Sequence, residues 1–266
     1  MIKKIVKRVA HLFGFEISLL SQNGSTYARY DYEEEAKSNI AICGKYSMMP
    51  VVNLATLYEQ AVYCEKFQIA GDFVECGVWK GGAVGMMAAA NLKHGKQRRD
   101  LHLFDAFDDI CEPDPEKDGA FAVADVKKLS NGKVDPKGTV EAMTGFYDQF
   151  GGHGTIDTCQ ELLTQKLKYP KENIIYHKGW FQNTVEHDAK NISAIAVLRL
   201  DGDWYDSIKI CLDHLYPKVT KGGLVVIDDY GYYEGCTKAV DEYLSEHQIK
   251  TFLSYSNYGC RYFVKP

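Results

Sequence analysis

Short, largely apolar runs alternate along the chain with segments whose apolar residues recur at helical spacing. The runs occupy residues 72–76, 101–105, 174–178, 194–200 and 224–227. Strands of a parallel sheet that are buried on both faces have such sequences, and helices connect them. After the fourth run, for example, Ile208, Leu212 and Leu215 share one helical face, and the helix stops at Pro217. The pattern predicts an α/β fold with parallel strands and crossover helices.

The end of the chain predicts an antiparallel hairpin. Residues 251–255 and 261–264 have strand composition, and Asn257, Tyr258 and Gly259 between them form a turn signal. Together with the earlier strands, this hairpin gives one doubly wound, seven-stranded, mostly parallel sheet. We expect a single domain over residues 51–266.

The start of the chain has a different pattern. Residues 1–13 read as a basic amphipathic helix with an apolar stripe. Its other face carries Lys3, Lys4, Lys7 and Arg8. Such a helix can lie on an anionic membrane surface, or it can pack on its own domain or on a second subunit. We group residues 1–50 as this helix and a lid segment.

A long segment separates the second predicted strand from the third. Residues 108–150 contain Pro113-Asp-Pro, several glycines and a helical patch around 140–150. Insertions of this length in compact domains are usually functional lids or disordered segments. We interpret this insertion as a cap over the substrate pocket.

Composition and charge exclude several classes of protein. The net charge of −5 argues against nonspecific nucleic-acid binding, which requires a basic surface. The cysteines are scattered without a Cys-x-x-Cys pair, which is typical of reduced thiols rather than of disulfides or a zinc site. No apolar run approaches the roughly 20 residues that span a bilayer. We expect a cytoplasmic homo-oligomer without a signal peptide, whose residues 1–13 can contact the inner face of the membrane.

Acidic residues follow two of the predicted strands. Asp201 comes directly after one apolar run, and Asp228 and Asp229 come directly after another. The carboxyl ends of parallel strands meet at one edge of the sheet, where ligands bind. Mg²⁺ prefers oxygen ligands such as carboxylates. These acids therefore predict a magnesium site, although Asp is also common wherever a loop follows a strand.

A second candidate site involves the first two strands. Gly77 begins a glycine-containing turn between a strand and a helix, as in nucleotide-binding sheets, but the turn lacks Gly-x-Gly-x-x-Gly and so disfavours a pyrophosphate. Glu75 can pair with a cationic group, and Asp105, at the end of the next strand, can accept hydrogen bonds from ribose hydroxyls. The three residues predict a pocket for S-adenosylmethionine. Alternatively, the glycines serve only the conformation of the turn, and Asp105 only begins a loop.

Four longer segments carry the most distinctive sequence. They read Val74-Glu-Cys-Gly-Val-Trp-Lys-Gly-Gly, Lys178-Gly-Trp-Phe-Gln-Asn-Thr, Leu198-Arg-Leu-Asp-Gly-Asp-Trp-Tyr-Asp-Ser and Val226-Ile-Asp-Asp-Tyr-Gly. In this order they resemble the macrocin O-methyltransferase (TylF-type) family, and the resemblance covers roughly residues 45–266. The N-terminal region and the insertion depart most from the family pattern, so the resemblance does not name the acceptor.

The resemblance implies a class I methyltransferase that uses S-adenosylmethionine and Mg²⁺ to methylate sugar hydroxyls, typically of macrolide deoxysugars. It implies a metal site similar to that of catechol O-methyltransferase, in which the metal chelates vicinal hydroxyls. The family's metal-binding acids match Asp201, Asp228 and Asp229. The family's cofactor positions match Glu75, Gly77 and Asp105.

The expected chemistry needs a base. Coordination to Mg²⁺ stabilises the alkoxide that develops on the sugar, and a neighbouring group removes the proton. Asp201 is our first choice for this base, and His187 is a weaker one because a lone histidine in a loop is more often solvated. Trp180 is expected to border the adenine with Phe181, or both rings pack between strand and helix. Asp203 is expected near the site.

Two other functions fit parts of the sequence. A Mg²⁺-dependent phosphoesterase would use the same carboxylates, but it leaves Glu75 and Asp105 unexplained. A noncatalytic binding protein with this fold would be expected to have lost a metal acid or the turn at Gly77, and both are present. For the methyltransferase, the acceptor is either a glycosylated metabolite or a surface glycan.

Overall fold

The computed structural model describes residues 33–266. The chain divides into Met1–Glu33 and Glu34–Pro266, and the second unit is described here. The helix predicted over residues 1–13 lies outside the described residues.

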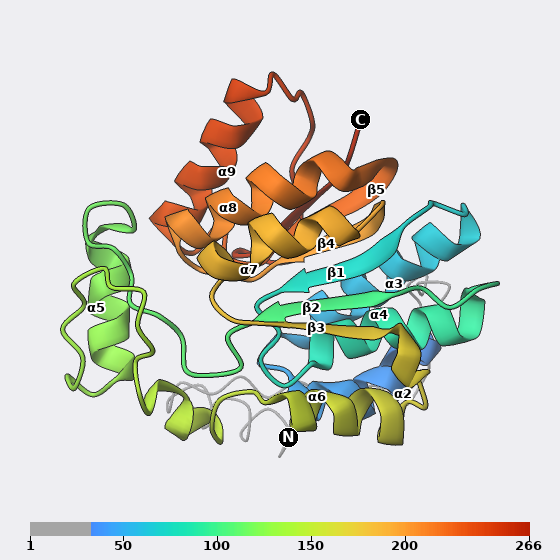
Figure 1. Ribbon diagram of the computed structural model, residues 1–266, viewed down its shortest axis with the longest axis horizontal. Coiled ribbons are helices and arrows are strands. Elements are labelled where there is room, and N and C mark those ends of the chain that lie inside the picture. Colours follow the sequence, from blue (N-terminus) through green and yellow to red (C-terminus); the bar gives the residue numbers. More distant parts are fainter. Residues whose placement is uncertain (1–32) are drawn as a thin grey trace, which may run out of the picture. The chain divides into compact units, whose positions relative to one another are not determined.

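A single mixed sheet forms the centre of this unit (Figure 1), and its strand order is β3-β2-β1-β4-β5-β7-β6. The strands are β1 (Asp72–Cys76), β2 (Leu101–Asp105), β3 (Ile174–Lys178), β4 (Ile195–Leu200), β5 (Val219–Ile227), β6 (Ser254–Tyr255) and β7 (Arg261–Val264). β1 to β5 are parallel, whereas β7 pairs antiparallel with both β5 and β6. The predicted doubly wound, seven-stranded sheet with a C-terminal hairpin is confirmed.

Helices cover both faces of the sheet. They are α2 (Glu33–Cys43), α3 (Val51–Lys66), α4 (Gly82–His94), α5 (Gly119–Leu129), α6 (Ile156–Gln160), α7 (Phe181–Asp188), α8 (Tyr205–Leu215) and α9 (Glu234–Glu246). Figure 1 shows α7, α8 and α9 on one face, and α2, α3, α4 and α6 on the other. Every residue of α4 from Gly82 to Asn91 is buried, because α4 packs against α3 as well as against β1 and β2 of the sheet. This layering leaves the carboxyl ends of the parallel strands open to ligands.

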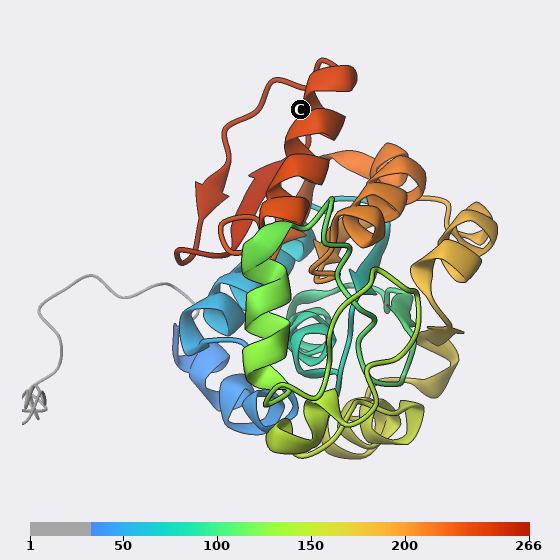
Figure 2. The same ribbon diagram turned by 90° about the vertical axis from the view of Figure 1, so that its left-hand side faces the viewer.

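The insertion is built differently from the expected helical patch. Its regular helix is α5, which packs against α9 (Figure 2) through a face that includes the buried Ala122 and Val126. In the region 140–150 only a short 3₁₀ helix, η2 (Phe146–Phe150), is present. Gly145 before it and Gly151 after it both have left-handed backbone conformations, which stop a regular helix from extending in either direction.

No single helix among residues 33–266 is long and apolar enough to cross a bilayer. The pair Glu34–Tyr46 and Val51–Lys66 meets the length and composition criteria together, but it is bent by 119°.

Candidate active site

A cavity lies at the carboxyl edge of the sheet. Its floor comes from the loops after four parallel strands and includes Gly77, Asp105, Trp180 and Asp201. The insertion supplies one wall, through residues that include Ile110, Leu129, Phe146 and Tyr147. The structure thus brings together four of the predicted site residues and places the insertion against them.

The turn after β1 requires glycine at its first position. Gly77 has φ +84°, and a Cβ on it would lie 1.8 Å from the backbone oxygen of Asp201. Its N–H donates to the carbonyl oxygen of Phe104 at 2.9 Å. Gly77 therefore lets the end of β1 contact the end of β4, which is where the cavity begins.

Asp105 organises this turn from the neighbouring strand. Its Oδ2 accepts hydrogen bonds from the backbone N–H of Val78 at 2.6 Å and of Trp79 at 3.0 Å, and its Oδ1 accepts one from Phe107 at 2.5 Å. Trp79 and Phe107 have left-handed backbones, with φ 48° and 51°. Burial raises the pKa of Asp105, and the three N–H donors oppose that rise. Asp105 thus holds the backbone around the cavity and also lines it.

A buried arginine joins the acids below the cavity. Arg199 is 1% exposed, and its Nη1 donates to Glu75 Oε1 at 2.6 Å and to Asp201 Oδ2 at 2.8 Å. Its Nη2 lies 3.1 Å from Asp228 Oδ1. Burial disfavours the charged guanidinium, but the neighbouring carboxylates Asp201, Asp228 and Glu75 hold the pKa of Arg199 well above its usual value. Arg199 is a site residue that the sequence analysis missed.

Glu75 lies beneath the cavity rather than in its lining. It faces Arg199 across the β1–β4 pair and is 1% exposed. Burial raises its pKa to about 8, against the pull of Arg199. Its Oε2 has no hydrogen-bond partner among the residues that the structure describes. Its predicted contact with a cationic ligand stays a prediction.

Three clustered carboxylates lie at the cavity, which two of them, Asp201 and Asp203, line. Ligand oxygens of Asp201, Asp203 and Asp229 all lie within 4.8 Å of one another. Burial, together with the charge of Asp201, raises the pKa of Asp203 to about 8. Burial, followed by the charge of Asp203, raises the pKa of Asp229 well above its usual value. Such close carboxylates repel one another unless protons or a cation compensate their charge.

Two of the three acids predicted to bind the metal lie in the close cluster, and the third does not. Asp201 and Asp229 belong to the close cluster, and Asp203 completes it, with a left-handed backbone at φ 54°. Asp228 is instead turned toward Arg199, and burial, partly offset by this ion pair, raises its pKa to about 6. Asp229 Oδ2 is buried and makes no hydrogen bond within residues 33–266. The three carboxylates of the cluster and this oxygen fit a hard divalent cation.

The remaining candidates divide between the cavity and the surface. Trp180 and Phe181 line the cavity and also pack against the core. Their predicted contact with the adenine stays a prediction. His187, on α7, has a side chain that is 80% exposed and lies outside the cavity lining. It is paired with Asp188, whose Oδ1 lies 2.7 Å from His187 Nδ1.

One buried carboxylate fastens the insertion over the cavity. Asp109 is 6% exposed and accepts hydrogen bonds from the backbone N–H of Gly145 at 2.7 Å and of Tyr147 at 3.0 Å. The indole of Trp204, next to the acidic cluster, donates to the carbonyl oxygen of Cys111 at 2.9 Å. The wall formed by the insertion is therefore tied to the same loop that carries the cluster.

The sheet order and the cavity at its carboxyl edge define a class I methyltransferase fold. The sequence model of the macrocin-O-methyltransferase (TylF) family matches residues 7–148 and 163–265, so the chain belongs to this family. The match includes the N-terminal region and most of the insertion, and is therefore wider than the resemblance of the four segments.

Individual relatives share part of their length with this chain. Demethyldecarbamoylnovobiocin O-methyltransferase of Streptomyces niveus is 32% identical over 181 residues, which cover 68% of this chain and 61% of the relative. A tetracenomycin 4'-O-methyltransferase of Streptomyces olivaceus, which acts on a dimethoxy-rhamnosyl compound, is 29% identical over 196 residues, covering 72% and 66%. The matched part thus spans less than two thirds of either relative. The structure of the O-methyltransferase NovP is similar with a TM-score of 0.65 and 28% identity, covering 83% of this chain and 82% of NovP.

Proposed function

We propose that this chain is an S-adenosylmethionine- and Mg²⁺-dependent O-methyltransferase that methylates a sugar hydroxyl. The observation that carries the proposal is that the glycine turn after β1, Asp201 and Asp203 line the same cavity, and that the carboxylates of Asp201 and Asp203 cluster with that of Asp229. Family membership and the sugar O-methyltransferases among the relatives support it.

Carboxylates of the cluster would hold the metal. Asp201 and Asp229 belong both to the acids expected from the sequence and to the close cluster, whereas Asp203 and Asp228 each belong to one set only. A bound Mg²⁺ would stabilise the alkoxide that develops on the sugar. The variants Asp203→Asn and Asp228→Asn distinguish the cluster in the structure from the acids expected from the sequence. If Asp203 is a ligand, Asp203→Asn loses more Mg²⁺ affinity than Asp228→Asn, as measured by calorimetry.

Asp201 is the proposed base. Its side chain lines the cavity, and its Oδ2 already accepts the hydrogen bond from Arg199. Its Oδ1 is therefore the oxygen that takes the proton of the acceptor hydroxyl. Arg199 keeps Asp201 in place during this transfer, because the guanidinium is itself held by Glu75.

The other predicted residues would bind the cofactor, which supplies an electrophilic methyl group on a sulfonium. Oδ1 of Asp105 accepts only one backbone hydrogen bond, so its second lone pair can accept a hydrogen bond from the ribose. Trp180 would border the adenine at the end of β3. Glu75 would lie beneath the cofactor's cationic end, and that cation would favour the ionised form of the carboxyl. The apolar rings of Phe146 and Tyr147 would exclude water and align the reacting atoms.

A phosphoesterase would need groups that bind phosphate. Among the described residues that line the cavity, none is a lysine or arginine, while Asp105, Asp108, Asp109, Asp201 and Asp203 are all acidic. Such a lining disfavours a phosphate ester.

The test is methyl transfer from labelled S-adenosylmethionine to a panel of glycosides, measured for wild type and for the variant Asp229→Asn. We expect at least one glycoside to be labelled by wild type, and labelling to fall strongly in the variant. Hydrolysis of an aryl phosphate, without binding of S-adenosylmethionine, would support the phosphoesterase instead.

A further inference from the structure

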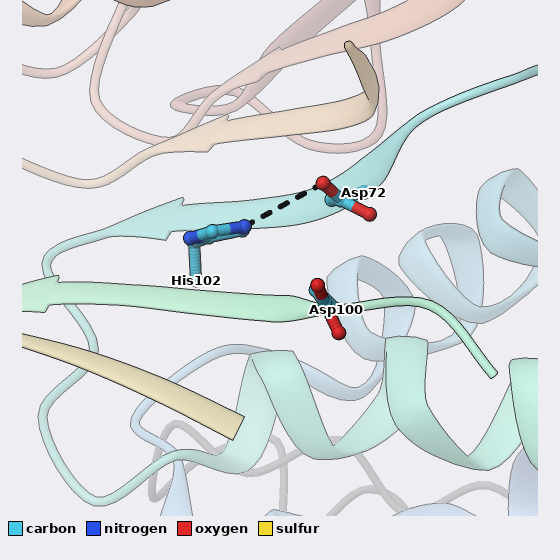
Figure 3. A group of neighbouring side chains, drawn as sticks. All are labelled: Asp72, Asp100 and His102. Carbon is cyan, nitrogen blue, oxygen red and sulfur yellow. Dashed lines mark ion pairs between the residues drawn. The ribbon is translucent and has the colours of Figure 1, made fainter. Parts of the chain in front are cut away.

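A second cluster of metal-binding side chains lies at the opposite edge of the sheet from the cavity. Asp72 begins β1, Asp100 precedes β2, and His102 is the second residue of β2. One ligand atom from each lies within 4.8 Å of the other two. Figure 3 shows His102 and Asp72 pointing toward each other, with Asp100 beside them.

The strand register explains why these three residues meet. Phe73 pairs with Leu101, which places Asp72 next to Asp100. Asp100 and His102 are two residues apart and therefore project from the same face of the sheet. His102 is 4% exposed, whereas the two aspartates are partly exposed. A solvent cation can thus reach the cluster from the side of the aspartates.

The far side of His102 fixes which of its nitrogens carries the hydrogen. His102 Nδ1 lies 3.0 Å from His177 Nε2, and His177 Nδ1 lies 2.8 Å from Asp188 Oδ2. A carboxylate only accepts, so His177 donates from Nδ1. With its hydrogen on Nδ1, His177 accepts at Nε2. His102 therefore donates from Nδ1 to His177, which leaves the lone pair of its Nε2 for a ligand.

This lone pair faces carboxylates. His102 Nε2 lies 3.5 Å from Asp72 Oδ2, a contact that is not a hydrogen bond when Nε2 carries no hydrogen. Among residues 33–266, Asp100 accepts a side-chain hydrogen bond on one oxygen, Oδ1, from Asn173 Nδ2 at 2.7 Å. The cluster thus joins an imidazole nitrogen and two carboxylates that all offer electron pairs. A cation between them removes the mutual repulsion.

We propose that Asp72, Asp100 and His102 bind a divalent transition-metal ion such as Zn²⁺. Imidazole with carboxylate suits Zn²⁺, in contrast to the oxygen-only cluster in the cavity, which suits Mg²⁺. Metal-binding histidines regularly donate their other N–H to a fixed acceptor, as His102 does to His177. Ligand atoms about 2.1 Å from a metal are at most about 4.2 Å apart, so binding requires only a small contraction. The ion would join the starts of β1 and β2.

A second group of two aspartates and a histidine has carboxylate oxygens that are already used in hydrogen bonds. Asp108, Asp109 and His153 also place ligand atoms within 4.8 Å of one another. Both oxygens of Asp109, however, already accept backbone hydrogen bonds from Gly145 and Tyr147. Its hydrogen-bonding role in the insertion therefore accounts for Asp109 without a metal.

Calorimetric titration with Zn²⁺ tests the site. The experiment compares wild type with Asp72→Asn and His102→Gln, and with Asp229→Asn, which alters only the cavity cluster. We expect one Zn²⁺ event to weaken more than about tenfold in the first two variants and to persist in Asp229→Asn. Equal Zn²⁺ affinity in wild type, Asp72→Asn and His102→Gln would overturn the proposal. Because Asp72 is partly exposed and Asn has the same shape, this variant is expected to fold.

Long-range ¹H–¹⁵N spectra of the imidazoles give a second readout. Without metal, we expect His102 to carry its hydrogen on Nδ1, and we expect added Zn²⁺ to shift the Nε2 resonance. A His102 that is protonated on both nitrogens and does not respond to Zn²⁺ would mean that a proton, rather than a metal, compensates the aspartates. Methyl transfer enters neither readout, so failure here leaves the proposed function untouched.

Discussion

Replacing Arg199 by methionine is expected to lower stability substantially. The variant removes a guanidinium that is 1% exposed and lies 2.6 Å from Glu75, 2.8 Å from Asp201 and 3.1 Å from Asp228. Removing one partner of a buried ion pair costs about 3–5 kcal/mol, because the other charge stays buried without compensation. At pH 7 the cost falls mainly on Asp201 and Asp228, because Glu75, with a pKa of about 8, is already largely protonated. We therefore expect a loss of about 3 kcal/mol at pH 7.

The pH dependence gives the same variant a sharper signature. Glu75 has a raised pKa in the folded state, so its contribution to stability is highest below its unfolded pKa and falls as pH rises. In wild type this fall ends above about pH 8, where Glu75 is ionised in both states. Without Arg199 the pKa of Glu75 in the folded state is higher still, so the stability of the variant continues to fall above about pH 8. The stability difference between wild type and the variant should therefore grow above about pH 8.

Urea unfolding at pH 7 and pH 9 measures both effects. Lys209→Met is the matched control, because Lys209 forms a more exposed ion pair with Asp213 at 2.7 Å. Such pairs contribute about 0–1 kcal/mol. A loss in Arg199→Met no larger than in this control, or a difference that shrinks at pH 9, would refute the account of Arg199 as the buried counter-charge.

Three further outcomes are expected. Gly77→Ala should abolish S-adenosylmethionine binding in calorimetry or unfold the protein, because the new Cβ would lie 1.8 Å from Asp201 O; normal binding and stability would exclude the tight turn. Glu35→Gln should cost about 1 kcal/mol at pH 7. Its carboxylate is paired mainly with Lys93, which lowers its pKa to about 2, so the stability that it contributes is lost as pH falls from about 4.5 to 2. If the stabilities of wild type and Glu35→Gln differed by the same amount at every pH between about 4.5 and 2, this explanation would be wrong. Deletion of residues 1–13 should reduce sedimentation with anionic liposomes, and unchanged sedimentation would favour packing or oligomerisation.

The sequence was sufficient for the sheet and for the edge at which the site lies. Apolar runs ending in Asp105, Asp201 and Asp228 place acids at the carboxyl ends of parallel strands, and the structure has these strands. The insertion was less predictable. Its helix α5 is stabilised by packing against α9, a contact between segments far apart in the chain.

Individual roles within the site depended on contacts that the sequence does not display. Arg199 is conspicuous as a cation within an apolar strand, but its partners follow from the register that sets it opposite Glu75. The place of Asp203 in the cluster accompanies a left-handed backbone that only the structure reveals. The same holds for Asp228, whose neighbour Asp229 joins the cluster while Asp228 itself pairs with Arg199.

We propose above all that clustered carboxylates at the carboxyl edge of the sheet hold a metal that the reaction needs. The most direct measurement is methyl transfer to an accepted glycoside after EDTA treatment, followed by stepwise return of Mg²⁺. The account predicts loss of activity with EDTA, recovery with Mg²⁺ in wild type, and recovery only at higher Mg²⁺ in Asp229→Asn. Full activity of the EDTA-treated enzyme would contradict it and leave Asp201, Asp203 and Asp229 with a structural role.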